Sequence, residues 1–445
     1  MHSTLAPLQP LARVHLIDAL RGFALLGILL INLGAFSLFW GVPAEQKAAL
    51  STVRWDQGTQ FLLELFVRGK FYSLFSLLFG LGFAIQMLRA EERGDDFLPV
   101  FQRRLMVLAG IGFVHIAFVW DGDILLLYAL LGFLLIPFRR ASDRTLLVTA
   151  TALIASPILI DTVIMLSGGR LDPGAPLLWI GSTIYADWFG YADTEEAWMQ
   201  HALSGGLGEF LRWSLPGPFY RYADLLSTSR IPKVFAMFLV GLWLGRRQLF
   251  RDIETHRAMW RRLFVWGLVL GLPANLALAW LVEVLRVEPF TPAGLMATTA
   301  YAAGVAPLAL AYAAGFALLW RRPRWAMGLS VLAPVGRMAL TNYIVQSVIC
   351  IGIFYGIGLG LGGRVSPVYF PLLALSLFAV QAGLSHAWLR WFRFGPLEWL
   401  WRSLTYRQWQ PLRMRRDESK AGGALNDSRH QVSGIRDGRP SEVTE

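Results

Sequence analysis

A histidine and two aspartates near the first third of the chain are the residues best placed to do chemistry. His115 lies inside an apolar segment, and Asp121 and Asp123 occupy the short break before the next one, in GIGFVHIAFVWDGDILLLYALLGF. An imidazole has an ordinary pKa of about 6.5, so His115 suits general base catalysis near neutral pH. Asp123 would then orient the imidazole, as the acid of a catalytic triad does. Both aspartates also suit the N-cap of the helix that follows, and that structural reading stays open.

Further polar residues fall at two depths along the predicted helices. Asp18 and Arg21 stand three residues apart at the start of the first helix, so they share a face and can pair. Asn32 follows Arg21 by eleven residues, which places it about 16 Å further along that helix. Asp161 reaches a similar level on a later helix. We therefore expect an outer polar group of Asn32, His115 and Asp161.

A second polar group is expected toward the other surface. The segment GRMALTNYIVQS (336–347) begins with Arg337 and carries Asn342 and Gln346 one turn apart. Amides at this spacing also serve as contacts between membrane helices. Glu398 and Arg402 are four residues apart on a predicted surface helix, a spacing that suits an ion pair at the interface.

The elements that position these residues are membrane helices. Of the 445 residues, 55% are hydrophobic and only 16% are charged, and the mean hydropathy is +0.48. The composition predicts an all-α, polytopic integral membrane bundle. A charged start and an unusual length make the first apolar segment a retained helix and not a signal peptide. The apolar segments predict about ten membrane spans, at 17–41, 71–89, 105–120, 123–138, 145–167, 233–246, 262–284, 293–320, 336–358 and 367–390.

The distribution of basic residues orients these spans. With ten spans, five basic clusters fall on one side, and the positive-inside rule makes that side the cytoplasm. We expect residues 1–16 to form a cytoplasmic segment, residues 17–406 a membrane domain, and residues 407–445 a cytoplasmic tail, largely disordered from about Asp417. Residues 168–232 form an extracytoplasmic insertion, either a passive cap or a functional lid. Because the basic residues lie in short loops between apolar segments, we expect membrane lipids and not nucleic acid as partners. No metal is expected either, since neither HExxH nor CxxC spacing is present.

Five motifs give the chain a family resemblance. They are LIDALRGFALLGILLIN (16–32), GKFYSLFSLLFGLGFA (69–84), GIGFVHIAFVWDGDILLLYAL (110–130), GRMALTNYIVQS (336–347) and FGPLEWLWRSLTY (394–406). Together they resemble the YeiB-like family of bacterial inner-membrane proteins, a domain of unknown function, over nearly the whole chain. The first helix is also similar to that of membrane-bound acyltransferases of the heparan-glucosaminide acetyltransferase type, through Asp18, Arg21, Gly22 and Asn32.

The acyltransferase resemblance implies a reaction. An acyl group would pass from a cytoplasmic acyl-CoA, such as acetyl-CoA, to an extracytoplasmic hydroxyl or amine. By this resemblance Arg21 would approach the phosphates of the donor, and Asn32 would face the transfer site. We expect the donor site to include Asp18, Arg337, Asn342 and Arg402 as well, since they lie toward the basic side. From this resemblance we would expect a histidine soon after Asn32, yet residues 33–70 contain none. On this hypothesis His115 supplies the base, oriented by Asp123 or Asp161. A proton-coupled transporter or lipid-handling permease, and a non-catalytic scaffold, remain the alternatives.

Overall fold

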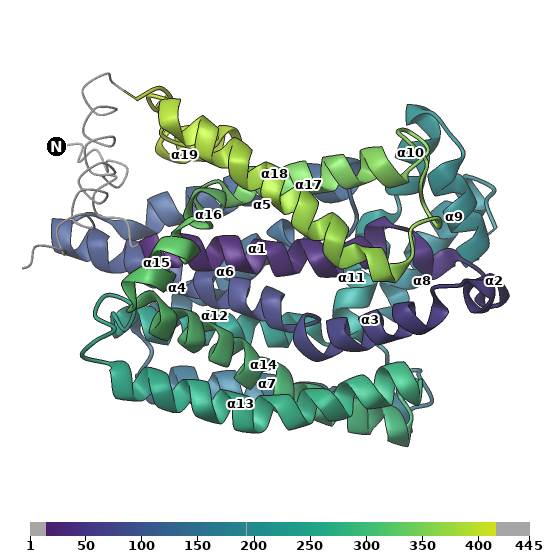
Figure 1. The fold of residues 1–445 in the computed structure, drawn as a ribbon, viewed down its shortest axis with the longest axis horizontal. Coiled ribbons are helices and arrows are strands. Elements are labelled where there is room, and N and C mark those ends of the chain that lie inside the picture. Colours follow the sequence, from purple (N-terminus) through teal and green to yellow (C-terminus); the bar gives the residue numbers. More distant parts are fainter. Residues whose placement is uncertain (1–14, 193, 415–445) are drawn as a thin grey trace, which may run out of the picture.

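The computed structural model describes residues 15–192 and 194–414, and these form an elongated bundle of helices (Figure 1). In the described residues the only pairing of strand type is a single bridge between Phe392 and Arg413. Residues 1–14 and the predicted tail from Asp417 lie outside the described residues. The longer helices are α1 (His15–Phe36), α3 (Val53–Phe66), α4 (Lys70–Arg93), α5 (Phe97–Phe118), α6 (Leu125–Leu135), α7 (Asp143–Leu166), α11 (Gly217–Ser227), α12 (Arg230–Arg246), α13 (Arg257–Ala279), α14 (Pro292–Trp320), α17 (Ala339–Phe354), α18 (Phe370–Trp391) and α19 (Pro396–Tyr406). The shorter elements are η2 (Phe39–Gly41), α2 (Ala44–Ala49), η3 (Ile136–Arg140), α8 (Ala175–Thr183), η4 (Ile184–Trp188), α9 (Glu195–Leu203), α10 (Leu207–Ser214), η5 (Trp280–Val284), α15 (Pro323–Ser330), α16 (Ala333–Arg337) and η6 (Pro367–Tyr369).

The prediction of an all-α protein with several membrane-length helices is confirmed. Seven helices among the described residues are long and apolar enough to cross a membrane, and an eighth arises if the pair α10–α11 and α12, bent by 72°, counts as one span. Each of the ten predicted apolar segments coincides with helix. The predicted spans at 123–138, 233–246 and 336–358 correspond to α6, α12 and α17, which have 11, 17 and 16 residues. These three helices fall short of the roughly 20 residues that a straight crossing needs.

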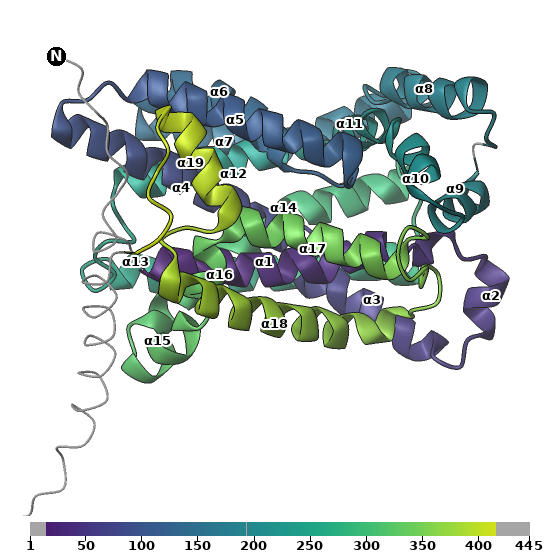
Figure 2. The same ribbon diagram turned by 90° about the horizontal axis from the view of Figure 1, so that it is seen from above.

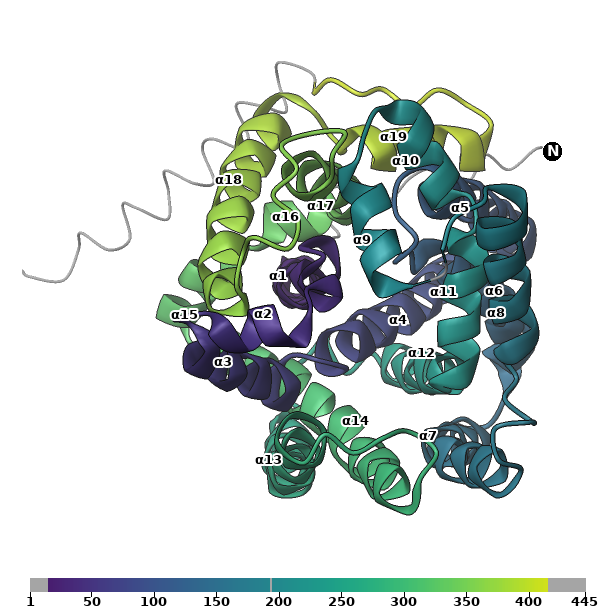
Figure 3. The ribbon, with the colours of Figure 1, turned by 90° about the vertical axis from the view of Figure 1, so that its right-hand side faces the viewer.

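Helix α1 is central and α7 is peripheral (Figure 3). In the apolar window of α1, 61% of the residues are buried, whereas 17% are buried in that of α7. Where helices cross closely, small residues allow backbone contact, as is typical in membranes. At the crossing of α4 and α12, a Cβ added to Gly80 would lie 2.0 Å from the Phe238 carbonyl oxygen, and one on Gly241 would lie 2.0 Å from that of Leu77. Only glycine fits at these two positions.

The basic loops gather at one end of the bundle, where α15, α16 and α19 also lie (Figures 1 and 2). Their contacts join loops that are distant in sequence. The Arg103 Nε donates to the Thr405 carbonyl oxygen at 3.0 Å. Arg247 forms an ion pair with Asp143, with its Nη2 2.6 Å from Oδ2. The first contact joins α5 to α19 and the second joins the end of α12 to α7, and all four sites lie at this end of the bundle.

Residues 168–232 form mostly short helices toward the opposite end (Figures 1 and 2). Here α8 packs beside α11, α9 lies next to η2 and the loop after α17, and α10 packs against α9 and α5. The backbone N–H of Gly356 donates to the Ala202 carbonyl oxygen at 2.9 Å. The predicted surface helices of this segment therefore sit over one end of the bundle.

Candidate functional site

The turn between α5 and α6 brings His115 and Asp123 together. Helix α5 ends at Phe118, and the Trp120 backbone N–H donates to the His115 carbonyl oxygen at 2.8 Å. The Asp123 Oδ1 accepts a hydrogen bond from the Leu126 backbone N–H at 2.8 Å, as an N-terminal cap does. Gly122 is required in this turn because a Cβ there would lie 2.2 Å from the Trp120 ring.

Both ring nitrogens of His115 have a side-chain partner. Nδ1 lies 2.8 Å from Asp123 Oδ2, and Nε2 lies 3.0 Å from the Ser347 hydroxyl on α17. His115, Asp123 and Ser347 are each at most 2% exposed. An imidazole held by a carboxylate on one nitrogen and a hydroxyl on the other has the order of groups found in a catalytic triad.

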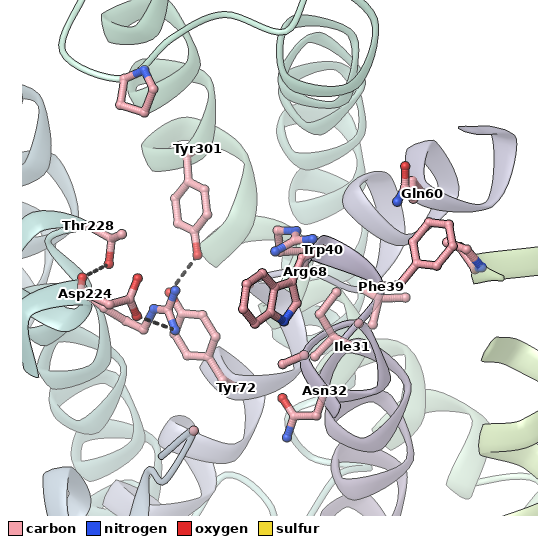
Figure 4. A pocket seen from close by; sticks show the side chains of 18 of the residues that line it. Ile31, Asn32, Phe39, Trp40, Gln60, Arg68, Tyr72, Asp224, Thr228 and Tyr301 are labelled. Atoms are coloured by element: carbon pink, nitrogen blue, oxygen red, sulfur yellow. Dashed lines mark hydrogen bonds and ion pairs between the residues drawn. The ribbon is translucent and has the colours of Figure 1, made fainter. Parts of the chain in front are cut away.

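A large cavity, here called the outer cavity, opens on the side of the bundle nearest the 168–232 helices. Its volume is about 1200 Å³, and it reaches from α1 to α7, α11 and α14. Asn32, Asp121 and Asp161, all predicted site residues, line it (Figure 4 labels Asn32). On the wall formed by α4 and α14, the Tyr72 and Tyr301 hydroxyls are 2.6 Å apart, and Figure 4 shows them facing Asp224 and Thr228.

The two aspartates of this outer cavity do not bond to His115. The Asp161 Oδ2 accepts a hydrogen bond from Thr298 on α14, and Asp161 Oδ1 has no hydrogen-bond partner among the described residues. Asp121 lies in the turn, where burial raises the pKa of its carboxyl and the positive charge of Arg221 opposes that rise. Because Asp123 and Ser347 occupy the two ring nitrogens, the structure pairs His115 with Asp123 and not with Asp161.

A smaller cavity of about 170 Å³, here called the inner cavity, lies toward the basic end of the bundle. Four arginines line it: Arg21, Arg104, Arg337 and Arg402. Its remaining wall is mostly apolar and includes Leu25, Phe79 and Leu105. The inner cavity therefore combines positive charge with an apolar slot, which suits an amphiphile with an anionic head.

The inner and outer cavities share three lining residues, Ile28, Ile124 and Tyr343. Along α1 the order is consistent with this wall, since Arg21 and Leu25 line the inner cavity and Ile31 and Asn32 line the outer one. His115 lines neither cavity. Its ring lies directly behind the wall, with its centroid 5.3 Å from that of Tyr343.

Two predicted donor-site residues, Asp18 and Asn342, have other neighbours, and so does Glu398, which was expected to pair with Arg402 at the interface. Asp18 is 2% exposed and forms an ion pair with Arg21, with its Oδ1 3.0 Å from Nη1, but it lines neither cavity. The Asn342 side chain donates to the Val335 carbonyl oxygen and the Ser385 hydroxyl, so it joins α17 to neighbouring segments. Glu398 lines the inner cavity and accepts hydrogen bonds from the backbone N–H groups of Leu340 and Thr341.

Two residues near His115 and in the inner cavity could not be recognised from the sequence. Ser347 appears in it as one hydroxyl among several, and nothing local marks it as the partner of His115. Arg104 belongs to a basic cluster that the sequence marks only as a topology signal. The structure places it on α5, where its guanidinium stacks over the Trp401 ring at 3.7 Å and lines the inner cavity. Both assignments depend on helices that are far apart in sequence.

Comparison with known proteins identifies the family of this chain. Residues 244–408 match a family described as "Protein of unknown function (DUF418)". The chain is 32% identical over 417 residues to "Uncharacterized protein YeiB" of Escherichia coli (strain K12), which covers 88% of this chain and 96% of that protein. The chain belongs to the YeiB-like family. It is also 34% identical over 428 residues to "Uncharacterized protein YxaH" of Bacillus subtilis (strain 168), covering 92% and 98% of the two chains.

The YeiB-like resemblance predicted from five motifs is thereby confirmed, and it covers about nine-tenths of the chain. A third YeiB-like relative, "Uncharacterized 39.9 kDa protein in amylase 3'region" of Bacillus acidopullulyticus, is 28% identical over 418 residues, or 91% of this chain and 97% of that protein. None of these descriptions names a reaction. The chemistry of this YeiB-like chain must be argued from its own site.

Proposed function

We propose that this YeiB-like protein transfers an acyl group across the bacterial inner membrane, from cytoplasmic acyl-CoA to an extracytoplasmic hydroxyl or amine. The observation that carries the proposal is the wall of Ile28, Ile124 and Tyr343, where the inner and outer cavities meet. A donor in one cavity and an acceptor in the other would face each other there. The histidine pair lies immediately behind the same wall.

The topology belongs to the proposal. The seven long helices, together with α6, α12 and α17, make ten crossings, with short helices crossing steeply or spanning a locally thinner bilayer. An even number of crossings puts both termini on the side of the basic loops. By the positive-inside rule this side is the cytoplasm, so the inner cavity opens to cytoplasmic acyl-CoA.

The inner cavity fits the donor by charge and by polarity. Arginine binds phosphate through paired N–H donors, so Arg21, Arg104 and Arg402 suit the diphosphate and ribose phosphate of CoA. Glu398 does not cancel this charge fully, because its carboxylate accepts the two N–H groups at the start of α17. The apolar slot would take the extended arm that carries the thioester, with the acyl carbon at Tyr343.

His115 supplies the proton transfer. Asp123 holds Nδ1, so Nε2 accepts the proton of the acceptor hydroxyl or amine while the acceptor oxygen or nitrogen attacks the thioester carbonyl carbon. The Asn32 side chain donates to the oxygen that becomes negative. The carbon–sulfur bond then breaks, and the CoA thiolate takes the proton from His115. Because His115 lines neither cavity, Tyr343 must move aside and the acceptor must replace the Ser347 hydroxyl at Nε2.

The first test is equilibrium binding of acetyl-CoA to the purified, full-length protein in detergent. We expect saturable binding that weakens in Arg21→Ala, survives in His115→Ala and is unchanged in Arg324→Ala. Arg324 is the control because it lies on α15 at the same end and lines neither cavity. Transfer from radiolabelled acetyl-CoA to membrane-envelope acceptors should then require His115. No binding of acetyl-CoA or longer thioesters to a folded protein would overturn the proposal.

A proton-coupled transporter is the second candidate, and the pair of opposite charges in the outer cavity favours it. Asp161 on α7 and Lys233 on α12 both line this cavity, and Asp161 keeps one oxygen without a hydrogen-bond partner among the described residues. Carboxylates within membrane helices build proton relays in transporters. Proton-driven uptake that disappears in Asp161→Asn, with no acyl product formed by the wild type, would establish the transporter instead.

A further inference from the structure

Arg221 on α11 connects the 168–232 segment to the turn that carries Asp123. Its Nε donates to the Asp123 carbonyl oxygen at 3.1 Å, and its Nη2 donates to the Gly122 carbonyl oxygen at 3.3 Å. Its Nη1 donates to the Asp224 carboxylate at 3.3 Å. One guanidinium therefore binds two successive carbonyl groups of the turn and is itself held by a carboxylate on its own helix.

The start of α11 also packs directly against this turn. A Cβ added to Gly217 would lie 2.9 Å from the Asp121 Cβ, so the helix backbone approaches the turn closely. Gly217 and Arg221 are four residues apart and lie on one face of α11. Two independent contacts thus hold Asp121, Gly122 and Asp123 from the side of the 168–232 segment.

The turn transmits this constraint to the histidine. The carbonyl group of Asp123 is bound by Arg221, and its carboxylate is bound to His115 and to the Leu126 backbone N–H. Arg221 lines the outer cavity, where the side chain is 14% exposed, so it also stands between the acceptor space and the turn. A residue that fixes the backbone of Asp123 fixes where Oδ2 meets the imidazole.

We infer that Arg221 is a positioning residue for the His115–Asp123 pair and that the 168–232 segment is part of the reaction site and not a passive cap. The inference rests on the proposed acyl transfer. The planar fork of an arginine can donate to two neighbouring carbonyls at once, whereas a lysine ammonium is a compact point charge. The geometry therefore calls for arginine and not for positive charge alone.

The experiment compares wild type, Arg221→Gln, Arg221→Lys and Arg212→Gln as full-length proteins. Arg212 on α10 is the matched control, since it also pairs with a carboxylate three residues away, Glu209, but it is 59% exposed and lines neither cavity. The first readout is hydrogen exchange of peptides covering residues 119–126. We expect exchange to rise about tenfold in Arg221→Gln and to stay unchanged in Arg212→Gln. Arg221→Lys should lie between the two.

The second readout is acetyl transfer, with kcat and the acetyl-CoA KM measured separately. We expect kcat to fall about 10–100-fold in Arg221→Gln, because displacing a catalytic group by about 1 Å costs that order of rate, while the donor KM stays within about twofold of wild type. Unchanged exchange at 119–126 would overturn the inference, as would faster exchange with unchanged kcat. If the wild type neither binds acetyl-CoA nor transfers an acyl group, the proposed function fails. The exchange data alone then decide whether Arg221 holds the turn.

Discussion

The Asp123 carboxylate bonds to His115 with one oxygen and to the start of α6 with the other. Its Oδ2 lies 2.8 Å from the imidazole Nδ1, and its Oδ1 accepts the Leu126 backbone N–H that opens α6. The two side chains are 1% and 0% exposed. The structural and the catalytic readings of Asp123 are therefore not alternatives, because starting the helix and orienting the imidazole use different oxygens.

Replacing Asp123 by asparagine should leave the fold intact and remove most of the activity. The amide oxygen can still accept from Leu126, but the amide nitrogen faces His115 Nδ1 and favours the wrong tautomer. We expect kcat for acyl transfer to fall about 10²- to 10⁴-fold with acetyl-CoA binding preserved. Asp96→Asn is the control, since Asp96 caps the start of α5 in the same way and is far from His115 in sequence. Equal kcat in Asp123→Asn and Asp96→Asn would contradict the role.

Replacing Ser347 by alanine distinguishes a direct reaction from an acyl-enzyme. If the acceptor takes the place of the Ser347 hydroxyl, losing that hydroxyl should change kcat by no more than about threefold, an effect of less than 1 kcal/mol. If Ser347 instead carried the acyl group, transfer would be lost together with a trappable ester. Single-turnover transfer with labelled acetyl-CoA, followed by mass spectrometry of residues 339–354, separates the two.

Replacing Tyr343 by alanine should open the wall between the two cavities. Water would then reach the thioester from the outer side, since excluding water is one function of a closed site. We expect acetyl-CoA hydrolysis without acceptor to rise, and transfer to acceptor to fall. Tyr343→Phe keeps the ring against His115 and should hydrolyse donor at the wild-type rate. Equal hydrolysis in the alanine and phenylalanine variants would contradict the role of the Tyr343 ring as a barrier between the two cavities.

Glu398 should matter more for stability through its oxygens than through its charge. Burial raises the pKa of its carboxyl, while its oxygens accept the Thr341 hydroxyl and the N–H groups of Leu340 and Thr341. Glu398→Ala leaves these buried donors without an acceptor, and we expect a loss of about 2–4 kcal/mol. Glu398→Gln keeps one acceptor oxygen and no charge, so its melting temperature should lie closer to wild type. Thermal unfolding in detergent gives the order, and a glutamine variant less stable than alanine would contradict it.

Gly336 should tolerate no side chain. A Cβ there would lie 1.8 Å from the Asp18 carbonyl oxygen, where α16 crosses α1. Because both partners are backbone, Gly336→Ala must separate the helices, and we expect a loss of about 1–3 kcal/mol or failure to fold. Gly352→Ala on α17 is the control, since nothing lies within 4 Å of its added Cβ. Comparable monodispersity and melting temperature for the two variants would show that the crossing is looser than described.

Local patterns in the sequence were enough for the helical class, the positions of the apolar helices and the pairing of Asp18 with Arg21. They also singled out His115 and Asp123, because an ionisable residue in an apolar segment is conspicuous and the partner lies only eight residues away. Of the expected outer polar group, Asn32 and Asp161 line the same cavity, but Asp161 does not lie beside His115. Depth along a helix says nothing about which way a side chain faces. Asn342 was expected in the donor site, yet its side chain bonds to Ser385 and lines neither cavity.

The helical segments, the end that carries the positive charge and the residues that are costly to keep in a membrane can all be recognised in the sequence. These properties follow from composition and from short spacings. Two contacts emerge only when the helices are packed: Ser347, 232 positions from His115, bonds to the second imidazole nitrogen, and Arg221, 98 positions from Asp123, holds the turn. In a membrane both the lipid-facing and the inward-facing sides of a helix are apolar, so the sequence pattern barely records which faces meet. Close packing of small residues and a few polar contacts set those pairings, and they become visible only when the helices are assembled.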